Sequence, residues 1–97
     1  MPTYVLTYRT QKDYRGSPES MNAWNSWFKE LGDSVRERGN PVFARAQLGA
    51  LATDSVLGGY SLVEAANLDA AVEMAKTCPI LASGGGVEVG ELTVINE

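Results

Sequence analysis

The segment at residues 3–9, "TYVLTYR", is apolar on both sides, and this constrains the fold more than any other feature of the chain. Tyr4, Leu6 and Tyr8 alternate with Val5 and Thr7, a period of two that is typical of a β-strand. A strand whose sheet is covered on one face only alternates apolar with polar residues. We therefore expect a sheet with helices on one face and a second layer on the other.

The next segment has the pattern of an amphipathic helix. Its apolar residues fall at positions 21, 24, 28, 31 and 35, which places them on one stripe of the helix. Ser17 and Pro18 precede the stripe as an N-cap and a first-turn proline. Gly39-Asn40-Pro41 predicts the end of the helix, because glycine and asparagine tolerate the left-handed C-terminal conformation and proline cannot continue a helix.

A second helix is predicted over residues 68–78. Asn67 is its N-cap and Pro79 stops it. The residues expected on its buried face are Leu68, Ala71, Val72 and Ala75.

Three further strands are predicted, at residues 42–48, 56–65 and 86–95, and residues 49–55 are predicted to form a loop. Gly58-Gly59 indicates a bulge or a close approach by another backbone segment. The alternation of the last strand slips near Gly90, which predicts a second bulge there.

The predicted order is strand, helix, strand, strand, helix, strand, and residues 1–97 form a single domain. Two helices can cover only one face of a four-stranded antiparallel sheet, yet the first and third strands are apolar on both faces. A second copy of the same sheet is the simplest cover for the other face. We therefore expect an α+β domain that forms a homodimer through the sheet.

Composition excludes several kinds of chemistry and several partners. The chain has no histidine, so it lacks the commonest general base near neutral pH and the usual zinc and iron ligand sets; we expect no metal and no cofactor. Its one cysteine agrees with a reducing compartment. The net charge of −4 is spread without basic blocks, and no apolar run is long enough to span a membrane. We expect a cytoplasmic protein that binds neither nucleic acid nor membranes.

The chain resembles the YCII-related (DGPF-like) domain family. The resemblance rests on "WNSWFKELGDSV" in the first helix, "GNP", "GGYSLVEAANLDAAVEMAKTCPIL" and "GGGVEV", and it covers nearly the whole chain. It implies a ferredoxin-like βαββαβ fold, with two helices on one face of the antiparallel sheet, that dimerises into a dimeric α+β barrel.

The resemblance does not extend to the chemistry proposed for the founding type of the family. That type is proposed to use a histidine on the first helix and an aspartate just after the second. Here those positions fall between Met21 and Trp24 and at Cys78, and neither residue type is present. The DGPF signature is also missing, since residues 52–55 read Ala-Thr-Asp-Ser. Whether the chain is an enzyme therefore stays open.

The stretch "CPILASGGGVEV", residues 78–89, looks like a reactive loop but is better explained as a turn. Cys78 closes the second helix, where the helix dipole disfavours a thiolate, and we expect it to pack as a small apolar residue. Gly84-Gly85-Gly86 leads into a strand rather than a helix and lacks the lysine of a phosphate loop. Ser83 beside this turn is a candidate to hydrogen-bond a ligand, with a purely structural serine as the alternative.

The candidate ligand-binding residues are mainly aromatic. Trp24 and Phe28 lie at the centre of the helical stripe and are predicted core residues, whereas Trp27 lies at its margin and Tyr8 ends a strand, so these two are candidates to line a cleft between helix and sheet. Ordinary packing is the favoured alternative for both. The full set of candidates is Tyr8, Trp27, Arg45, Tyr60 and Ser83.

Arg45 is predicted to lie on a strand, and if it points into the space between two sheets it needs an anionic partner. Glu64, Glu88 and a ligand carboxylate are the possible partners, and a structural ion pair is the favoured alternative.

Three functions are compatible with these residues. The first is a domain that binds a small apolar or aromatic molecule, with arginine orienting an anionic group. The second is a cofactor-free isomerase, lyase or oxygenase acting on small aromatic or lactone substrates by means of tyrosine, arginine or carboxylate groups. The third is a regulatory or protein-interaction module without a ligand. An enzyme should show a titratable group with a strongly shifted pKa inside a closed cleft, whereas a roomy cleft without such a group would favour the first function. A collapsed interior with an exposed apolar patch would favour the third.

Overall fold

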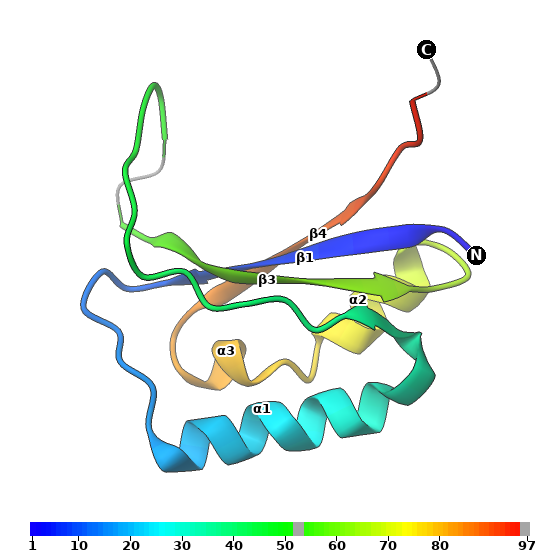
Figure 1. The fold of residues 1–97 in the computed structure, drawn as a ribbon, viewed down its shortest axis with the longest axis horizontal. Coiled ribbons are helices and arrows are strands. Elements are labelled where there is room, and N and C mark those ends of the chain that lie inside the picture. Colours follow the sequence, from blue (N-terminus) through cyan, green and yellow to red (C-terminus); the bar gives the residue numbers. More distant parts are fainter. Residues whose placement is uncertain (52–53, 96–97) are drawn as a thin grey trace.

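The computed structural model describes residues 1–51 and 54–95, and a four-stranded antiparallel sheet with helices on one face is its main feature (Figure 1). The elements are β1 (Thr3–Thr10), α1 (Pro18–Leu31), the 3₁₀ turn η1 (Gly32–Ser34), β2 (Val35–Glu37), β3 (Val56–Glu64), α2 (Leu68–Ala75), α3 (Pro79–Ala82) and β4 (Gly86–Glu91). The strands lie in the order β2, β3, β1, β4. The predicted α+β class with an antiparallel four-stranded sheet is confirmed.

The strand β1 lies inside the sheet, between β3 and β4, and its two faces differ in burial. Tyr4, Leu6 and Tyr8 are buried beneath the helices, whereas Val5 and Thr7 are half-buried on the open face of the sheet. The alternation predicted for this strand is therefore confirmed.

Helix α1 begins as predicted but ends earlier. The Ser17 hydroxyl accepts a hydrogen bond from the Ser20 N–H, and the Ser20 hydroxyl accepts one from the Ser17 N–H. Both hydrogen bonds of a capping box are therefore present. The helix ends at Leu31 because Gly32 takes φ 56° and its N–H bonds back to the Phe28 carbonyl. The prediction of helix through position 35 was wrong.

In the described part of the chain, no helix is long and apolar enough to cross a membrane.

The predicted strand at residues 42–48 is absent, and the strand that pairs with this edge of β3 is β2, whose residues were predicted as part of the first helix. Only the start of this segment touches the sheet: Pro41 forms an isolated bridge with Gly59, and the Val42 N–H donates to the Gly58 carbonyl at 3.0 Å. Residues 42–51, which we call the arm, then leave the body on the side of the sheet away from the helices (Figure 1). Residues 52–53 of the predicted loop at 49–55 lie outside the described residues.

The two predicted bulges have different outcomes. Tyr8 pairs with Gly59 while Arg9 pairs with Leu57, so Gly58 is an extra residue and the bulge at this position is confirmed. The bulge at Gly90 was wrong. The register of β4 against β1 runs without a break, and the pattern slips because the strand ends at Glu91 instead of continuing to residue 95.

The second helical segment is two helices. Helix α2 ends at Ala75, and Pro79 begins α3 as its first residue instead of only stopping the preceding helix. Cys78 therefore caps α3 and does not close α2. Of the expected buried face of α2, Ala71 and Ala75 are buried, while Leu68 and Val72 are largely exposed.

Candidate functional site

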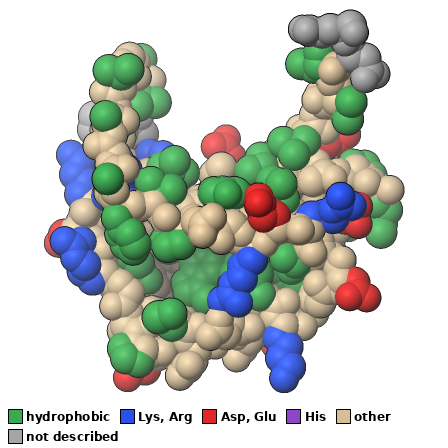
Figure 2. Space-filling view, in the orientation of Figure 1, with side chains coloured by type: hydrophobic (Ala, Val, Ile, Leu, Met, Phe, Trp, Pro, Cys, Tyr) green, Lys and Arg blue, Asp and Glu red, His purple; other side chains and the backbone are tan. Residues whose placement is uncertain are grey.

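A cavity lies between α1, the helix-facing side of β1 and β3, and the segment at residues 38–45. Its volume is about 280 Å³, just below the range of about 300–1,000 Å³ that is usual for ligand pockets. Figure 2 shows it as a hollow lined with hydrophobic side chains, between the sheet and α1. A cavity of this size suits a small ring compound rather than a long chain or a macromolecule.

The floor of the cavity is the buried ring of Tyr8, and a chain of hydrogen bonds fixes it. The Tyr8 hydroxyl donates to the Ser61 hydroxyl at 2.7 Å, and the Ser61 hydroxyl donates to the Arg38 carbonyl at 2.6 Å. Ser61 is fully buried. Since a buried hydroxyl without a partner is costly, this chain holds the backbone at residue 38 against the sheet.

Burial raises the pKa of Tyr8 well above its usual value, an effect that the hydrogen bond to Ser61 only partly offsets. The phenol is therefore neutral across the physiological range, and it contributes a ring and a fixed hydrogen bond rather than a base.

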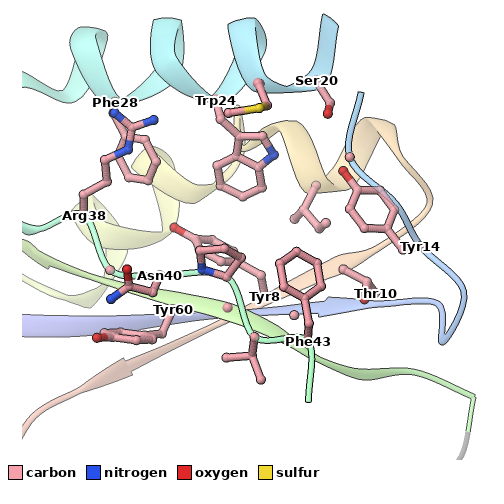
Figure 3. A pocket seen from close by; sticks show the side chains of 18 of the residues that line it. Tyr8, Thr10, Tyr14, Ser20, Trp24, Phe28, Arg38, Asn40, Phe43 and Tyr60 are labelled. Carbon is pink, nitrogen blue, oxygen red and sulfur yellow. The ribbon is translucent and has the colours of Figure 1, made fainter. Parts of the chain in front are cut away.

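One wall of the cavity is an aromatic cluster on α1. Trp24 meets the Tyr8 ring edge to face at 4.7 Å between centroids and stacks on Phe28 at 5.9 Å. Both α1 residues are half-buried, so each presents one side to the cavity. Figure 3 shows Trp24 pointing from the helix toward the Tyr8 and Phe43 rings. These aromatic surfaces can hold a planar apolar ligand by stacking and burial.

The opposite wall is the base of the arm. Phe43 lines the cavity although 65% of its surface is exposed to solvent. Arg45 ties this region to the sheet, because its Nη1 donates to the Val42 carbonyl at 2.7 Å and to the Leu57 carbonyl at 3.2 Å. The wall is thus held in place beside the sheet rather than free to swing with the outer arm.

The charged groups around the cavity are all basic. Arg38 and Arg45 line it, and none of its described lining residues is an aspartate or a glutamate. The ion pairs in the described part of the chain are Arg36 with Glu64 and Lys76 with Glu73, and neither involves a lining residue. In the same part of the chain, no cluster of carboxylate and cysteine side chains is arranged to hold a metal ion. The cavity favours an anion over a cation.

The structure brings some of the predicted site residues together and separates others. Tyr8 and Arg45 line the cavity. Tyr60 also borders it, but it pairs with Thr7 and so carries its side chain on the open face of the sheet. Trp27 and Ser83 do not: Trp27 is buried in the core, and Ser83 is an exposed turn residue whose hydroxyl donates to the Pro79 carbonyl at 3.4 Å.

The α1 aromatic residues agree with the prediction only in part. Trp27, predicted at the margin of the helical stripe, is only 3% exposed, as its favoured packing role requires, and its indole N–H donates to the Met74 carbonyl at 3.3 Å and the Thr77 hydroxyl at 3.1 Å. Trp24 and Phe28, predicted as core residues, pack against the core but also line the cavity. The predicted apolar stripe included Met21, which is 63% exposed in the structure, whereas the buried side of the helix is centred closer to Trp27.

The predicted environment of Arg45 was also wrong. It lies on the arm and not on a strand, and its partners are backbone carbonyls instead of Glu64 or Glu88. Glu64 pairs with Arg36 at 2.8 Å.

Sequence reasoning missed Arg38 and Tyr14, which also line the cavity. Arg38 stands in the polar run "RERGN", directly before the glycine at which the first helix was predicted to end. The sequence signal that could have identified Arg38 is the glycine that follows it. Gly39 takes φ 80° and lies too close to the Tyr60 backbone for any side chain to fit. Arg38, the preceding residue, is therefore held close to the sheet.

The stretch at residues 78–89 contains α3, a turn and the start of β4, so the predicted turn is limited to residues 83–85. Burial raises the pKa of the Cys78 thiol to about 11, so the thiol is protonated at neutral pH. Ser83 to Gly85 form the turn between α3 and β4, and a side chain at Gly85 would collide with the Arg9 carbonyl and with Ile80. Neither the cysteine nor the glycines line the cavity.

Comparison with known proteins adds no assignment to this geometry. No protein-family model matches the chain, and no curated protein matches its sequence.

Proposed function

We propose that the protein binds a small aromatic, anionic molecule in the cavity between α1 and the sheet. One observation carries this proposal: an open cavity with aromatic walls has two arginines and no acidic residue among its described lining residues. Aromatic surfaces supply apolar burial for a ring, and guanidinium groups are suited to a carboxylate. A cavity that served only as a packing defect would not need charged groups of one sign.

A binding function is better supported than catalysis or a role as an interaction module without a ligand. Of the lining residues, Tyr8 has a strongly shifted pKa, but the shift is upward and its proton is engaged by Ser61. Proton transfer near neutral pH needs a group whose pKa lies near 7. An interaction module without a ligand would have a collapsed interior, which does not agree with a cavity of about 280 Å³.

We also propose that the chain is a divergent YCII-related domain with a ferredoxin-like βαββαβ arrangement. The element order β1, α1, β2, β3, α2, β4 and the strand order β2, β3, β1, β4 support this proposal. The short helix α3 is an addition to the simple pattern, inserted where α2 leads into β4.

A homodimer through the open sheet face is the second part of this proposal. Val5, Tyr60 and Leu62 lie half-buried on that face, which no helix covers. The arm and residues 92–95 rise from the same side of the sheet (Figure 1), and both carry exposed apolar side chains, namely Phe43, Leu48, Leu51, Leu92, Val94 and Ile95. The molecule measures 36 × 35 × 20 Å, large enough for a standard interface of about 800 Å² per partner.

The dimer predicts a mass of two chains in light scattering at micromolar concentration. Leu62→Lys would place a charge on the open sheet face, within the proposed dimer interface. We expect this variant to be a monomer that keeps its circular dichroism spectrum. Leu68→Lys is the matched control, because Leu68 is 48% exposed on α2, away from the open face, and should leave the mass unchanged. A monomeric wild-type protein would contradict the proposal.

The ligand proposal predicts thermal stabilisation by aromatic carboxylates. A ligand present at 100 times its dissociation constant adds about 2.7 kcal/mol to the free energy of unfolding. For a domain of this size, that corresponds to a rise in melting temperature of roughly 10 °C or more. We expect Trp24→Ala to abolish the rise, because the substitution removes the stacking wall.

Val72→Ala is the control for this experiment, since Val72 is an apolar helix residue that lies on α2, outside the cavity. It should leave the ligand-induced rise intact. If a broad panel of aromatic carboxylates left the wild-type melting temperature unchanged, the proposed function would be wrong. A rise that survived in Trp24→Ala would place the ligand elsewhere.

A further inference from the structure

The position of Arg38 is set from both its backbone and its side chain. Its carbonyl accepts the hydrogen bond from the buried Ser61 hydroxyl. Its guanidinium lies over the Phe28 ring, with Cζ 4.6 Å from the ring centroid, and also donates to the Asn25 side-chain oxygen. A guanidinium stacked on an aromatic ring keeps its edge N–H groups directed outward and loses little freedom when it binds an anion.

The second arginine of the cavity is already engaged. Arg45 directs Nη1 at the Val42 and Leu57 carbonyls, and these bonds hold the base of the arm beside the sheet. Arg38, in contrast, has a neutral amide as its side-chain acceptor, and a carboxylate is a stronger acceptor than an amide oxygen. The two arginines therefore have different roles, although both line the same cavity.

The remaining lining gives the cavity a direction. Figure 3 shows Arg38 and Phe28 at one end and Tyr14 at the other, with Trp24 and Phe43 between them. A planar ring lying between Trp24 and Phe43 would carry a substituent at its edge toward Arg38. The substituent that a guanidinium edge recognises best in this geometry is a carboxylate.

We propose that Arg38 is the anion-binding residue of the cavity and that the ligand is a planar aromatic monocarboxylate whose ring stacks between Trp24 and Phe43. This inference rests on the binding function proposed above and assigns the chemical class of its ligand. Arg45 is a positioning residue that holds the Phe43 wall.

The test compares two probes of the same shape, 1-naphthoate and the neutral 1-naphthamide, by calorimetric titration. We expect the wild-type protein to bind the carboxylate about ten-fold more tightly than the amide, since one partly solvated, charge-assisted pair is gained. Arg38→Gln should remove this preference and leave the affinity for the amide within about two-fold of wild type. The retained binding of the amide shows that the variant is folded.

Two controls separate Arg38 from its neighbours. Arg36→Gln alters an arginine on β2 that pairs with Glu64 outside the cavity, and the preference should remain. Arg45→Gln should weaken both probes alike, because it loosens the wall and not the anion contact.

The possible outcomes distinguish this inference from the binding function. A preference that persists in Arg38→Gln, or that disappears only in Arg45→Gln, would overturn the role of Arg38. Equal binding of both probes by the wild type would overturn the carboxylate class while leaving the cavity as an aromatic binding site. If neither probe bound to the wild type, the binding function and this inference would both be overturned.

Discussion

Trp27→Ala is expected to lower the free energy of unfolding by about 3–5 kcal/mol, the range found for truncating a fully buried tryptophan. The side chain is 3% exposed, and its indole N–H donates to the Met74 carbonyl and the Thr77 hydroxyl, so its removal opens a cavity and breaks both hydrogen bonds. A domain of this size has a stability of about 5–15 kcal/mol, so much of the protein should be unfolded at moderate denaturant concentration.

The matched variant is Trp24→Ala, three positions earlier on the same helix. Trp24 is half-buried and faces an open cavity, so we expect its truncation to cost about 1–2 kcal/mol. Urea denaturation followed by circular dichroism at 222 nm measures both variants at one protein concentration. Equal losses for the two variants would contradict the assignment of Trp27 to the core and Trp24 to the cavity wall.

Gly39→Ala should lower the free energy of unfolding by about 3 kcal/mol or more. Gly39 has φ 80°, and a methyl group there would overlap the Tyr60 backbone carbonyl, which is part of β3. The clash is between two backbone segments and cannot be relieved by rotating a side chain. The segment that carries Arg38 must therefore move away from the sheet. We expect the same variant to weaken the binding of an aromatic carboxylate.

Gly49→Ala is the control that separates backbone strain from the close approach. Gly49 has φ 79°, almost the same as Gly39, but an added methyl group would meet nothing within 4 Å. The left-handed conformation alone should cost about 1–2 kcal/mol. Chemical denaturation of the two variants gives the difference, and similar losses would show that the approach of Gly39 to Tyr60 is not a tight one.

The elements with both a clear periodicity and a clear cap could be predicted from the sequence. Residues 3–10 alternate strictly, and Ser17 and Asn67 mark helix starts with side chains that the structure uses as caps. These features are local, because each depends on neighbours within a few positions along the chain. The class of the fold followed from their order.

The error at residues 35–48 arose because strand pairing depends on segments that are distant in the sequence. Residues 42–48 alternate as a strand does, but β2 pairs with β3 at Leu62 and Val63, and the 42–48 segment touches β3 only at its start, near Gly58 and Gly59. A local pattern does not contain these pairings. The same error hid the site: Arg38 and Phe43 meet the α1 aromatic residues only because the chain turns at Gly39.

The prediction that placed Trp24, and not Trp27, at the centre of the buried stripe failed for a different reason. Both residues are apolar and only three positions apart, so a small rotation of the stripe decides which faces the core. The deciding contacts of Trp27 come from Met74 and Thr77, far away in the sequence. Helical periodicity alone cannot supply them.

The most direct test of the central claim is an NMR titration of the uniformly ¹⁵N-labelled protein with 1-naphthoate. The chain has two tryptophans, and a Trp24→Phe variant assigns their indole signals. Binding in the cavity predicts a saturable shift of the Trp24 indole signal together with the backbone amides of Gly39 and Phe43, while the amides of Thr7 and Leu62 on the open sheet face stay in place. No saturable shift, or shifts that cluster on the open sheet face, would contradict the account.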